Sequence, residues 1–336
     1  MMKMKSPGRR NLITDIDGLY VGHAMDSQIK SGVTVLTADQ PFTAAMHVMG
    51  GAPGSRETDL LAPDKMVQAV DALVLAGGSA HGLDAASGVM ARLHQSGRGF
   101  PVGDQTVPIV PAAIIFDLLN GGDKSWTENP YATLGRHAYD AAGTDFQLGS
   151  HGAGTGATTA TVKGGLGSAS LAFDNGVMIG ALAVANPMGS VHCPDSNRFW
   201  GASCEIDDEY GARGMPLHYD PFDVRTKQHP HANSNTVIGI VATNLKLDKA
   251  SLTRLATAAH DGIARAVQPS HTPLDGDLIF AVSTGQHDAP CDAHDLAMLG
   301  HGAALCVTRG ICRGVWQADV AAGDHLPVIR DLIGTE

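Results

Sequence analysis

Residues His229 to Asn244 read HPHANSNTVIGIVATN, and the chain changes character within them. Its first half is polar and contains a proline, which is typical of a loop. Its second half, Thr236–Thr243, is rich in β-branched residues and predicts a buried strand. Thr236 is thus a hydroxyl residue at the first position of a strand, directly after Asn235. We predict a loop-to-strand boundary at this bond.

The chain after this boundary has the clearest periodicity. Asp248 can cap a helix, and Pro269 ends it. A strand is predicted at 278–284, an apolar helix at 293–309, and a short strand with a polar tail at the end. The first helix carries one apolar face with spacings of three and four residues, formed by Leu252, Leu255, Ala259, Ile263 and Val267.

The chain before the boundary alternates short β-type runs with turns. Helices are predicted at 83–93 and around 135–142. The segment 192–235 is mostly polar and holds four histidines, which favours an exposed linker with solvated loop histidines and no metal site. Branched and aromatic residues between turns predict strands at residues 19–22, 32–37, 43–49, 72–76 and 177–185.

Composition limits the class of protein. At 336 residues the chain is long enough for one large multilayer domain or two ordinary domains. Hydrophobic residues make up 43% and charged residues only 17%, which indicates a well-buried globular protein. The net charge of −11 argues against nucleic-acid binding, because that requires a basic surface.

Compartment and cofactors are also constrained. Five cysteines without a C-x-x-C pair favour reduced thiols and a cytoplasmic protein. No apolar core follows the basic residues 1–10, so we expect no signal peptide, and no run of about 18 apolar residues suggests a membrane span. The glycine turn at 77–82 fits no nucleotide fingerprint, and Asp275-Gly276-Asp277 lacks the other ligands of a calcium loop. We therefore expect no cofactor and no metal.

The chemistry of Thr236 depends on a neighbouring base. A threonine hydroxyl is a poor nucleophile alone, but the α-amine of an N-terminal threonine, with an ordinary pKa of about 7.7–8.0, is such a base. Cleavage of Asn235–Thr236 would release this amine. In the expected sequence the hydroxyl attacks the Asn235 carbonyl, an acyl shift forms an ester, and water hydrolyses it. Fragments of 235 and 101 residues (336 − 235) would result.

Four further residues have the chemistry that such a centre needs. Lys163, flanked by glycines and small residues, would depress the amine pKa by like charge. Asn186, at the end of a predicted strand, can aim two amide donors at an oxyanion. Asp275 or Asp277 would orient the ammonium group. Each also has a simpler interpretation: a solvated surface lysine, an asparagine that starts a turn, and a turn with two acids.

Six motifs follow one another along nearly the whole chain. They are GGAPGSRETD at 50–59, LVLAGGSAHG at 73–82, KGGLG at 163–167, ANP at 185–187, NT at 235–236 with its strand, and TPLDGD at 272–277. In this order they resemble the P1 peptidase family, the DmpA-like group of self-processing N-terminal-nucleophile hydrolases. The group includes L-aminopeptidase/D-amidase-esterases, β-peptidyl aminopeptidases and nylon-oligomer endohydrolases.

The resemblance implies a mixed α/β fold, a four-layer αββα sandwich like that of ornithine acetyltransferases. It implies one domain over residues 1–336, autocleaved into an α chain, 1–235, and a β chain, 236–336. It also implies that the two chains stay together and assemble as several αβ units, a homotetramer. The resemblance assigns six site roles, which are the nucleophile, the oxyanion donor, the lysine beside the nucleophile, two aspartates near the amine and a site tyrosine: Thr236, Asn186, Lys163, Asp275, Asp277 and Tyr131.

One departure affects the expected substrate. The best-known aminopeptidases of the group use serine at the cleavage point, whereas this chain has Asn-Thr, as the nylon-oligomer enzymes do. We expect an amide hydrolase, an aminopeptidase or amidase acting on short peptides or peptide-like amides. The alternatives are endo-hydrolysis of amide oligomers and, from a different class, a catalytically silent scaffold that binds small molecules.

Overall fold

Three central strands are apolar on both faces: β10 (Met178–Asn186), β11 (Thr236–Leu245) and β12 (Leu278–His287). Successive side chains of a strand point to opposite faces. In β10, Ala181 and Ala183 therefore contribute to one hydrophobic core, and Leu182 and Val184 to another. Strands buried on both faces must be covered by a layer on each side.

The computed structural model describes residues 2–227 and 235–333. A long strand, β3 (Ser31–Val48), belongs to two sheets, because its residues 43–48 pair with β12 and its residues 33–37 pair with β5. The first sheet has the order β1-β9-β10-β11-β12-β3, and the second has the order β2-β3-β5-β8-β4. The other strands are β1 (Met4–Ser6), β2 (Leu19–Asp26), β4 (Ser55–Arg56), β5 (Val70–Ala76), β8 (Ala112–Ile114), β9 (Gly165–Phe173), and a separate hairpin of β6 (Phe100–Val102) and β7 (Gln105–Val107).

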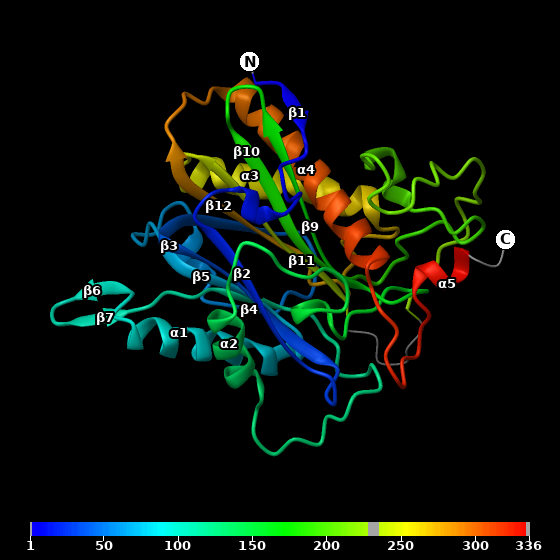
Figure 1. Ribbon diagram of the computed structural model, residues 1–336, viewed down its shortest axis with the longest axis horizontal. Helices are drawn as coiled ribbons and strands as arrows, with labels where there is room; N and C mark the ends of the chain where they lie inside the picture. The colour runs from blue at the N-terminus through cyan, green and yellow to red at the C-terminus, as the bar shows by residue number, and fades with distance from the viewer. Residues whose placement is uncertain (1, 228–234, 334–336) are drawn as a thin grey trace.

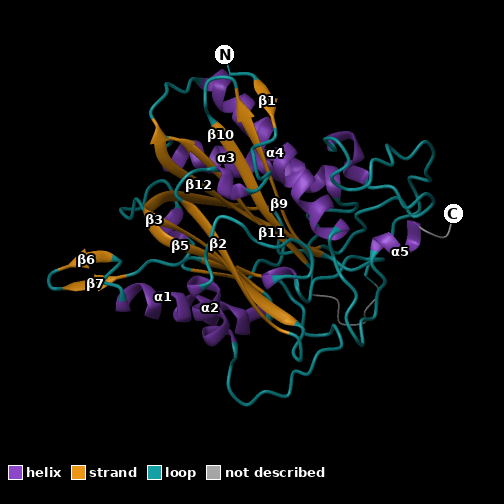
Figure 2. Cartoon of the chain, in the orientation of Figure 1, coloured by secondary structure: helices purple, strands orange, loops and turns teal. Residues whose placement is uncertain are grey.

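Three hydrophobic cores separate four layers. The first lies between the first sheet and the helices α3 (Lys249–Ala266) and α4 (Ala293–Trp316), the second between the two sheets, and the third between the second sheet and α1 (Ala85–Gln95) with α2 (Tyr131–Asp140). Figures 1 and 2 show this order of helices, sheet, sheet and helices. The predicted αββα sandwich is confirmed.

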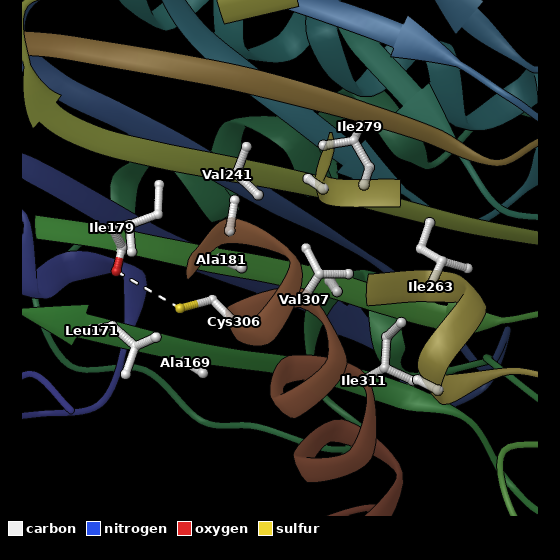
Figure 3. Close-up of a cluster of buried hydrophobic side chains, with 14 of the residues drawn as sticks. Ala169, Leu171, Ile179, Ala181, Val241, Ile263, Ile279, Cys306, Val307 and Ile311 are labelled. Atoms are coloured by element: carbon white, nitrogen blue, oxygen red, sulfur yellow. Dashed lines mark hydrogen bonds between the residues drawn. The ribbon is translucent and has the colours of Figure 1, made fainter. Parts of the chain in front are cut away.

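Helix α4 lies directly on the first sheet. In Figure 3, Cys306 and Val307 of α4 face Ile179 and Ala181 of β10. The predicted apolar face of α3 is buried, and Asp248 caps the helix by accepting a hydrogen bond from the Ser251 N–H at 2.8 Å.

Several boundaries differ from the predictions. The runs at 32–37 and 43–49 are one continuous strand, β3, and the terminal strand is wrong, because α5 (Ile329–Ile333) occupies that end. Strand β9 was not predicted. Its residues are small because α4 packs closely on them: a Cβ atom at Gly167 would collide with the carbonyl oxygen of Gly310.

The predicted exposed linker at 192–235 is only partly correct. His192 is buried, and one of its ring nitrogens lies 2.8 Å from the Thr161 hydroxyl, so it is not a solvated loop histidine. The segment from residue 214 to 225 is largely exposed, as predicted. The polar loop expected directly before the boundary, with His229 and His231, falls on residues 228–234, outside the described part of the chain.

Candidate active site

Strand directions bring the predicted site segments to one edge of the first sheet. β11 and β12 are parallel, with Ile238 opposite Leu278, so both strands begin at the same edge. β10 is antiparallel to β11, so its last residue, Asn186, lies opposite Thr236. The topology therefore gathers residues that are about 40–90 positions apart in sequence.

Two more segments reach this edge. β9 begins at Gly165, opposite Ala185, and so carries Lys163 towards the end of β10. β3 ends at Val48, opposite Leu278, and the glycine-rich loop that follows it packs on residues 272–277. The loop is held there by a backbone hydrogen bond of 2.8 Å from the Ala52 N–H to the Asp275 carbonyl.

The Thr236 side chain is buried and directed at the preceding peptide. Its hydroxyl donates a hydrogen bond to the Asn235 carbonyl oxygen. The same oxygen accepts a hydrogen bond from the Gly276 N–H at 2.8 Å. A Cβ atom at Gly276 would lie 2.8 Å from Thr236 Oγ1 and 2.6 Å from the Ala52 carbonyl oxygen, so this close approach requires glycine. A hydroxyl, a peptide carbonyl and a donor for the carbonyl oxygen are thus in contact.

Asn186 and Thr236 are side-chain neighbours. Residues directly opposite in an antiparallel pair point to the same face, with Cβ atoms about 4.5–5.5 Å apart. Asn186 Oδ1 accepts hydrogen bonds from the Thr158 N–H at 3.0 Å and from Lys227 Nζ at 3.1 Å. Because both contacts come from hydrogen-bond donors, the Asn186 atom that they contact is assigned as the amide oxygen. Its nitrogen donates to the Phe116 carbonyl at 3.1 Å.

Lys163 is buried and paired with a carboxylate from the C-terminal region. Its Nζ atom lies 2.6 Å from Oδ2 of Asp324, 161 residues away, and Lys30 Nζ lies 2.9 Å from Oδ1 of the same side chain. Lys163 is therefore not a solvated surface lysine. Among the described residues, Lys163 forms its ion pair with Asp324. Lys163 lies just before β9, and β10 lies between β9 and β11, the strand that begins with Thr236.

A cavity of about 300 Å³ lies beside Asn186. Three lysines and two aspartates line it, namely Lys30, Lys163, Lys227, Asp117 and Asp324. Lys227 also contacts the Asn186 carbonyl oxygen at 3.1 Å, and desolvation of its ammonium group lowers its pKa to about 7. The cavity thus offers several polar groups to a small molecule next to the predicted oxyanion donor.

Asp275 and Asp277 flank Thr236 and are both buried. Asp275 bridges to Asn235 through the backbone, and its carboxylate accepts the Met188 N–H at 2.9 Å. Asp277 accepts the Val237 N–H at 2.7 Å. Burial and the nearby charge of Asp277 raise the pKa of Asp275. The structure therefore brings both predicted aspartates to the residues on either side of Thr236.

The Tyr131 hydroxyl is hydrogen-bonded to Ser31 and not to Thr236. It donates to Ser31 Oγ at 2.8 Å, and Ser31 donates to Asp117 Oδ2 at 2.6 Å. Burial raises the pKa of Tyr131. Asp117 follows Phe116, whose carbonyl holds the Asn186 amide. Tyr131 is therefore connected to the site only through intermediate residues.

Sequence reasoning missed four residues of this region. Asp324 lies in a polar tail without a motif, and Lys227 and His271 lie in segments whose composition is that of ordinary loops. Gly276 was interpreted only as a turn residue. Only TPLDGD at 272–277 offered a signal, because its glycine lies between the two predicted acids. Lys227 and Asp324 pair with residues 41 and 161 positions away, which leaves no local pattern, and the contact of His271 with Asp277, six positions on, belongs to no recognised motif.

Metal and membrane features are absent from the described residues. Over 2–227 and 235–333, no cluster of three or more His, Cys, Asp or Glu side chains has the arrangement of a metal site. Within the same ranges no helix has the length and apolarity needed to cross a membrane. All five cysteines are free thiols.

Comparison with solved structures identifies the fold. The chain aligns over 99% of its length with 94% of a Burkholderia sp. β-aminopeptidase, with a TM-score of 0.73 and 21% identity. It aligns over 96% of its length with 91% of the L-aminopeptidase D-Ala-esterase/amidase of Ochrobactrum anthropi, which is described as a variant of the Ntn-hydrolase fold, with a TM-score of 0.68 and 23% identity. The fold is that of the Ntn-hydrolase aminopeptidases.

Sequence comparison identifies the family. The model of peptidase family S58 matches residues 11–327, so the chain belongs to this family and is a hydrolase acting on amide bonds. An uncharacterized aminopeptidase of Mycobacterium tuberculosis is 40% identical over 96% of this chain and 98% of its own length. A 6-aminohexanoate-oligomer endohydrolase of Kocuria sp. is 30% identical over 86% of this chain and 79% of its own length. The predicted family resemblance is confirmed.

Proposed function

We propose that this chain is a self-processing amide hydrolase whose nucleophile is the hydroxyl of Thr236. One observation carries the proposal: the hydroxyl contacts the Asn235 carbonyl, whose oxygen also accepts the Gly276 N–H at 2.8 Å. Nucleophilic attack on a carbonyl needs both a hydroxyl beside it and a donor for the oxygen that becomes negative. Gly276 would serve as that donor during self-cleavage.

The cleavage proceeds by an acyl shift. Thr236 Oγ1 forms a bond to the Asn235 carbonyl carbon, the carbon–nitrogen bond breaks, and the hydroxyl proton ends on the released nitrogen. Water then hydrolyses the ester and returns the Thr236 hydroxyl. The products are a carboxylate at Asn235 and a free α-amine at Thr236, which is the base that the hydroxyl needs.

Substrate hydrolysis reuses this hydroxyl. Thr236 attacks the substrate amide, the amine part leaves with a proton, and water hydrolyses the acyl-enzyme. We assign Asn186 as the oxyanion donor, because it lies opposite Thr236 and its amide is held by Thr158 and Lys227. Asp275 and Asp277 orient the amine.

The two remaining predicted residues, Lys163 and Tyr131, are proposed to act on the cavity beside Asn186 and not on Thr236 directly. Lys163 supplies positive charge to the cavity beside Asn186. Tyr131 supports the cavity wall through Ser31 and Asp117.

The substrate we propose is a short peptide or peptide-like amide with a free amino group. Support comes from the small size of the cavity and from the aminopeptidase relatives. We further propose that the α and β chains stay together as αβ units in a homotetramer, and that the protein is cytoplasmic. The five free thiols are consistent with a reducing compartment.

Denaturing gel electrophoresis with mass spectrometry tests the proposal. We expect fragments of 235 and 101 residues, the second beginning at Thr236. Thr236→Ala should leave the chain intact and abolish turnover, whereas Thr236→Ser should retain processing, because serine keeps the hydroxyl. Hydrolysis by Thr236→Ala would contradict the assignment of the nucleophile. An intact wild-type chain after long incubation would contradict self-processing and favour a non-catalytic scaffold.

A second candidate is endo-hydrolysis of amide oligomers. It is favoured by Asn-Thr at the cleavage point, by the Asp275–Asp277 pair, and by 30% identity to the Kocuria sp. oligomer endohydrolase. Free and N-acetylated peptides of the same sequence distinguish the two candidates. Loss of activity on the acetylated peptide supports an aminopeptidase, and equal activity on both supports the endohydrolase.

A further inference from the structure

Asp277 has a partner that the proposed chemistry does not use. One carboxylate oxygen accepts the Val237 N–H at 2.7 Å. The other lies 2.7 Å from Nδ1 of His271 and also accepts the His271 N–H at 3.1 Å. The side chains of His271 and Asp277 are only 14% and 1% exposed. Asp277 therefore connects the residue after Thr236 with a shielded imidazole.

The charged and titratable neighbours of His271 come from three elements. On its own loop these are Asp277 and Asp275. From α3, the His260 ring stands edge-on to His271 with ring centres 5.1 Å apart, and its Nε2 lies 3.1 Å from the carbonyl oxygen of His47 on β3. The His47 ring is 5.2 Å from that of His260.

Of these three histidines, His271 is the one in contact with Asp277 and the one whose pKa is raised. Burial lowers the pKa of His260 to about 4 and also lowers the pKa of His47, which Arg254 and His271 lower further. Both rings are therefore mostly neutral at neutral pH. Burial acts in the same direction on His271, but the contact with Asp277 outweighs it and raises the pKa of His271.

We propose that His271 is a positioning residue that holds Asp277 and balances its charge, and that it thereby sets the pH range in which the Thr236 amine acts as a base. The inference rests on the proposed cleavage at Asn235–Thr236. An unbalanced carboxylate near the amine favours the protonated amine, which cannot accept a proton. A protonated imidazole on the other side of that carboxylate opposes this effect.

Three variants test the charge balance by the pH dependence of kcat/KM, which reports groups of the free enzyme. His271→Gln removes the charge, and its acid limb should move to higher pH by about 0.5–1 unit, with activities converging at alkaline pH. His271→Lys restores a cation and should return the limb towards that of the wild type. His218→Gln, a substitution of an exposed histidine, should leave the profile unchanged. Mass spectrometry first establishes whether each protein is cleaved.

The outcomes separate this inference from the proposed function. If the wild type is cleaved and active, either of two results for His271→Gln overturns the role of His271 and leaves the nucleophile in place. One is an acid limb at the same pH as in the wild type, and the other is a kcat/KM that is lowered equally at all pH values. An intact wild-type chain has no free amine and overturns both.

A second measurement does not require a folded His271 variant. Coupling between two sites is reciprocal, so the protonated amine should lower the pKa of His271. NMR titration of the imidazole should therefore give a higher pKa in uncleaved Thr236→Ala than in the cleaved wild type. Equal values in the two proteins would overturn the inference.

Discussion

Two buried ion clusters join distant parts of this chain, and they use their donors differently. The arginine cluster consists of Glu209, Arg309 and Arg313. Arg309 is fully buried, and its Nε and Nη2 atoms lie 2.6 and 2.9 Å from the two oxygens of Glu209. The lysine cluster consists of Lys30, Lys163 and Asp324, where each ammonium group contacts one oxygen of the shared carboxylate.

The difference follows from the shapes of the two cations. The guanidinium group is a planar fork that matches a carboxylate. The donors of Arg309, which is on α4, are therefore used to hold the Glu209 side chain against this helix. A lysine ammonium is a compact charge with three donors. An ammonium held by one carboxylate oxygen can still act on a molecule in the cavity that it lines. We therefore expect the arginine cluster to determine stability and the lysine cluster to determine activity.

The largest expected effect is on stability. Glu209→Ala leaves Arg309 buried without its carboxylate, which should lower the free energy of unfolding by about 3–5 kcal/mol. Urea unfolding measures this loss. The kcat/KM of the folded variant should stay within about twofold of the wild type, since among the described residues Glu209 makes no contact with the reacting groups and its loss should leave the activation barrier unchanged. A large loss of kcat/KM with normal stability would reverse the comparison.

Lys163→Met should have the opposite profile. We expect kcat/KM or the rate of self-cleavage to fall by about 10²–10³-fold, the usual cost of one electrostatic group in an active site. The free energy of unfolding should change little, because Lys30 and the Ala321 N–H still contact Asp324. Lys65→Met, which removes an exposed lysine, is the matched control. Unchanged kinetics in Lys163→Met would remove this lysine from the site.

The two clusters should share one response to acid. Burial raises the pKa of Glu209 and of Asp324, but hydrogen bonds from the neighbouring cations outweigh it, so both pKa values are lowered. Groups with a lowered folded pKa stabilise the protein above the unfolded values, about 4.3 for Glu and 3.9 for Asp, and lose this contribution as pH falls through the folded pKa.

Urea unfolding between about pH 7 and pH 2.5 measures this response. The free energy of unfolding should decline below about pH 4, and Glu209→Gln and Asp324→Asn should each flatten the decline. A slope that both variants leave unchanged would mean that other carboxylates control acid unfolding.

The smallest effect is expected from Tyr131→Phe. The hydroxyl donates to Ser31 and not to a group at Thr236, so its loss should cost about 0.5–1.5 kcal/mol of stability, the net value of an ordinary hydrogen bond. We expect kcat/KM to stay within about threefold of the wild type, because no hydrogen bond to the reacting groups is lost. A fall comparable to that of Lys163→Met would mean that the tyrosine acts on substrate directly.

Local patterns determined much of the fold. The start of β11 at Thr236 and the capped helix α3 follow from hydrophobic periodicity, a cap and a proline, all of which operate within a few residues. The αββα order was implied by the family resemblance and not by these local patterns. Strand β9 escaped prediction because its small residues reflect contact with α4, not strand propensity. The C-terminal helix α5 escaped because five residues are too few for a periodic pattern.

The family, the amide-hydrolase class and the start of a strand at Thr236 could be predicted from the amino-acid sequence, because these depend on motifs and on short-range periodicity. The contacts of the site residues depend on tertiary packing. It paired Lys163 with Asp324, 161 residues away, joined His271 to Asp277, and directed the Tyr131 hydroxyl to Ser31. Lys163 and Asp324 meet because the segment after α4 packs on the residues before β9, where the Lys163 N–H also donates to the Pro327 carbonyl at 2.9 Å, and such packing is a property of the folded molecule and not of a local pattern.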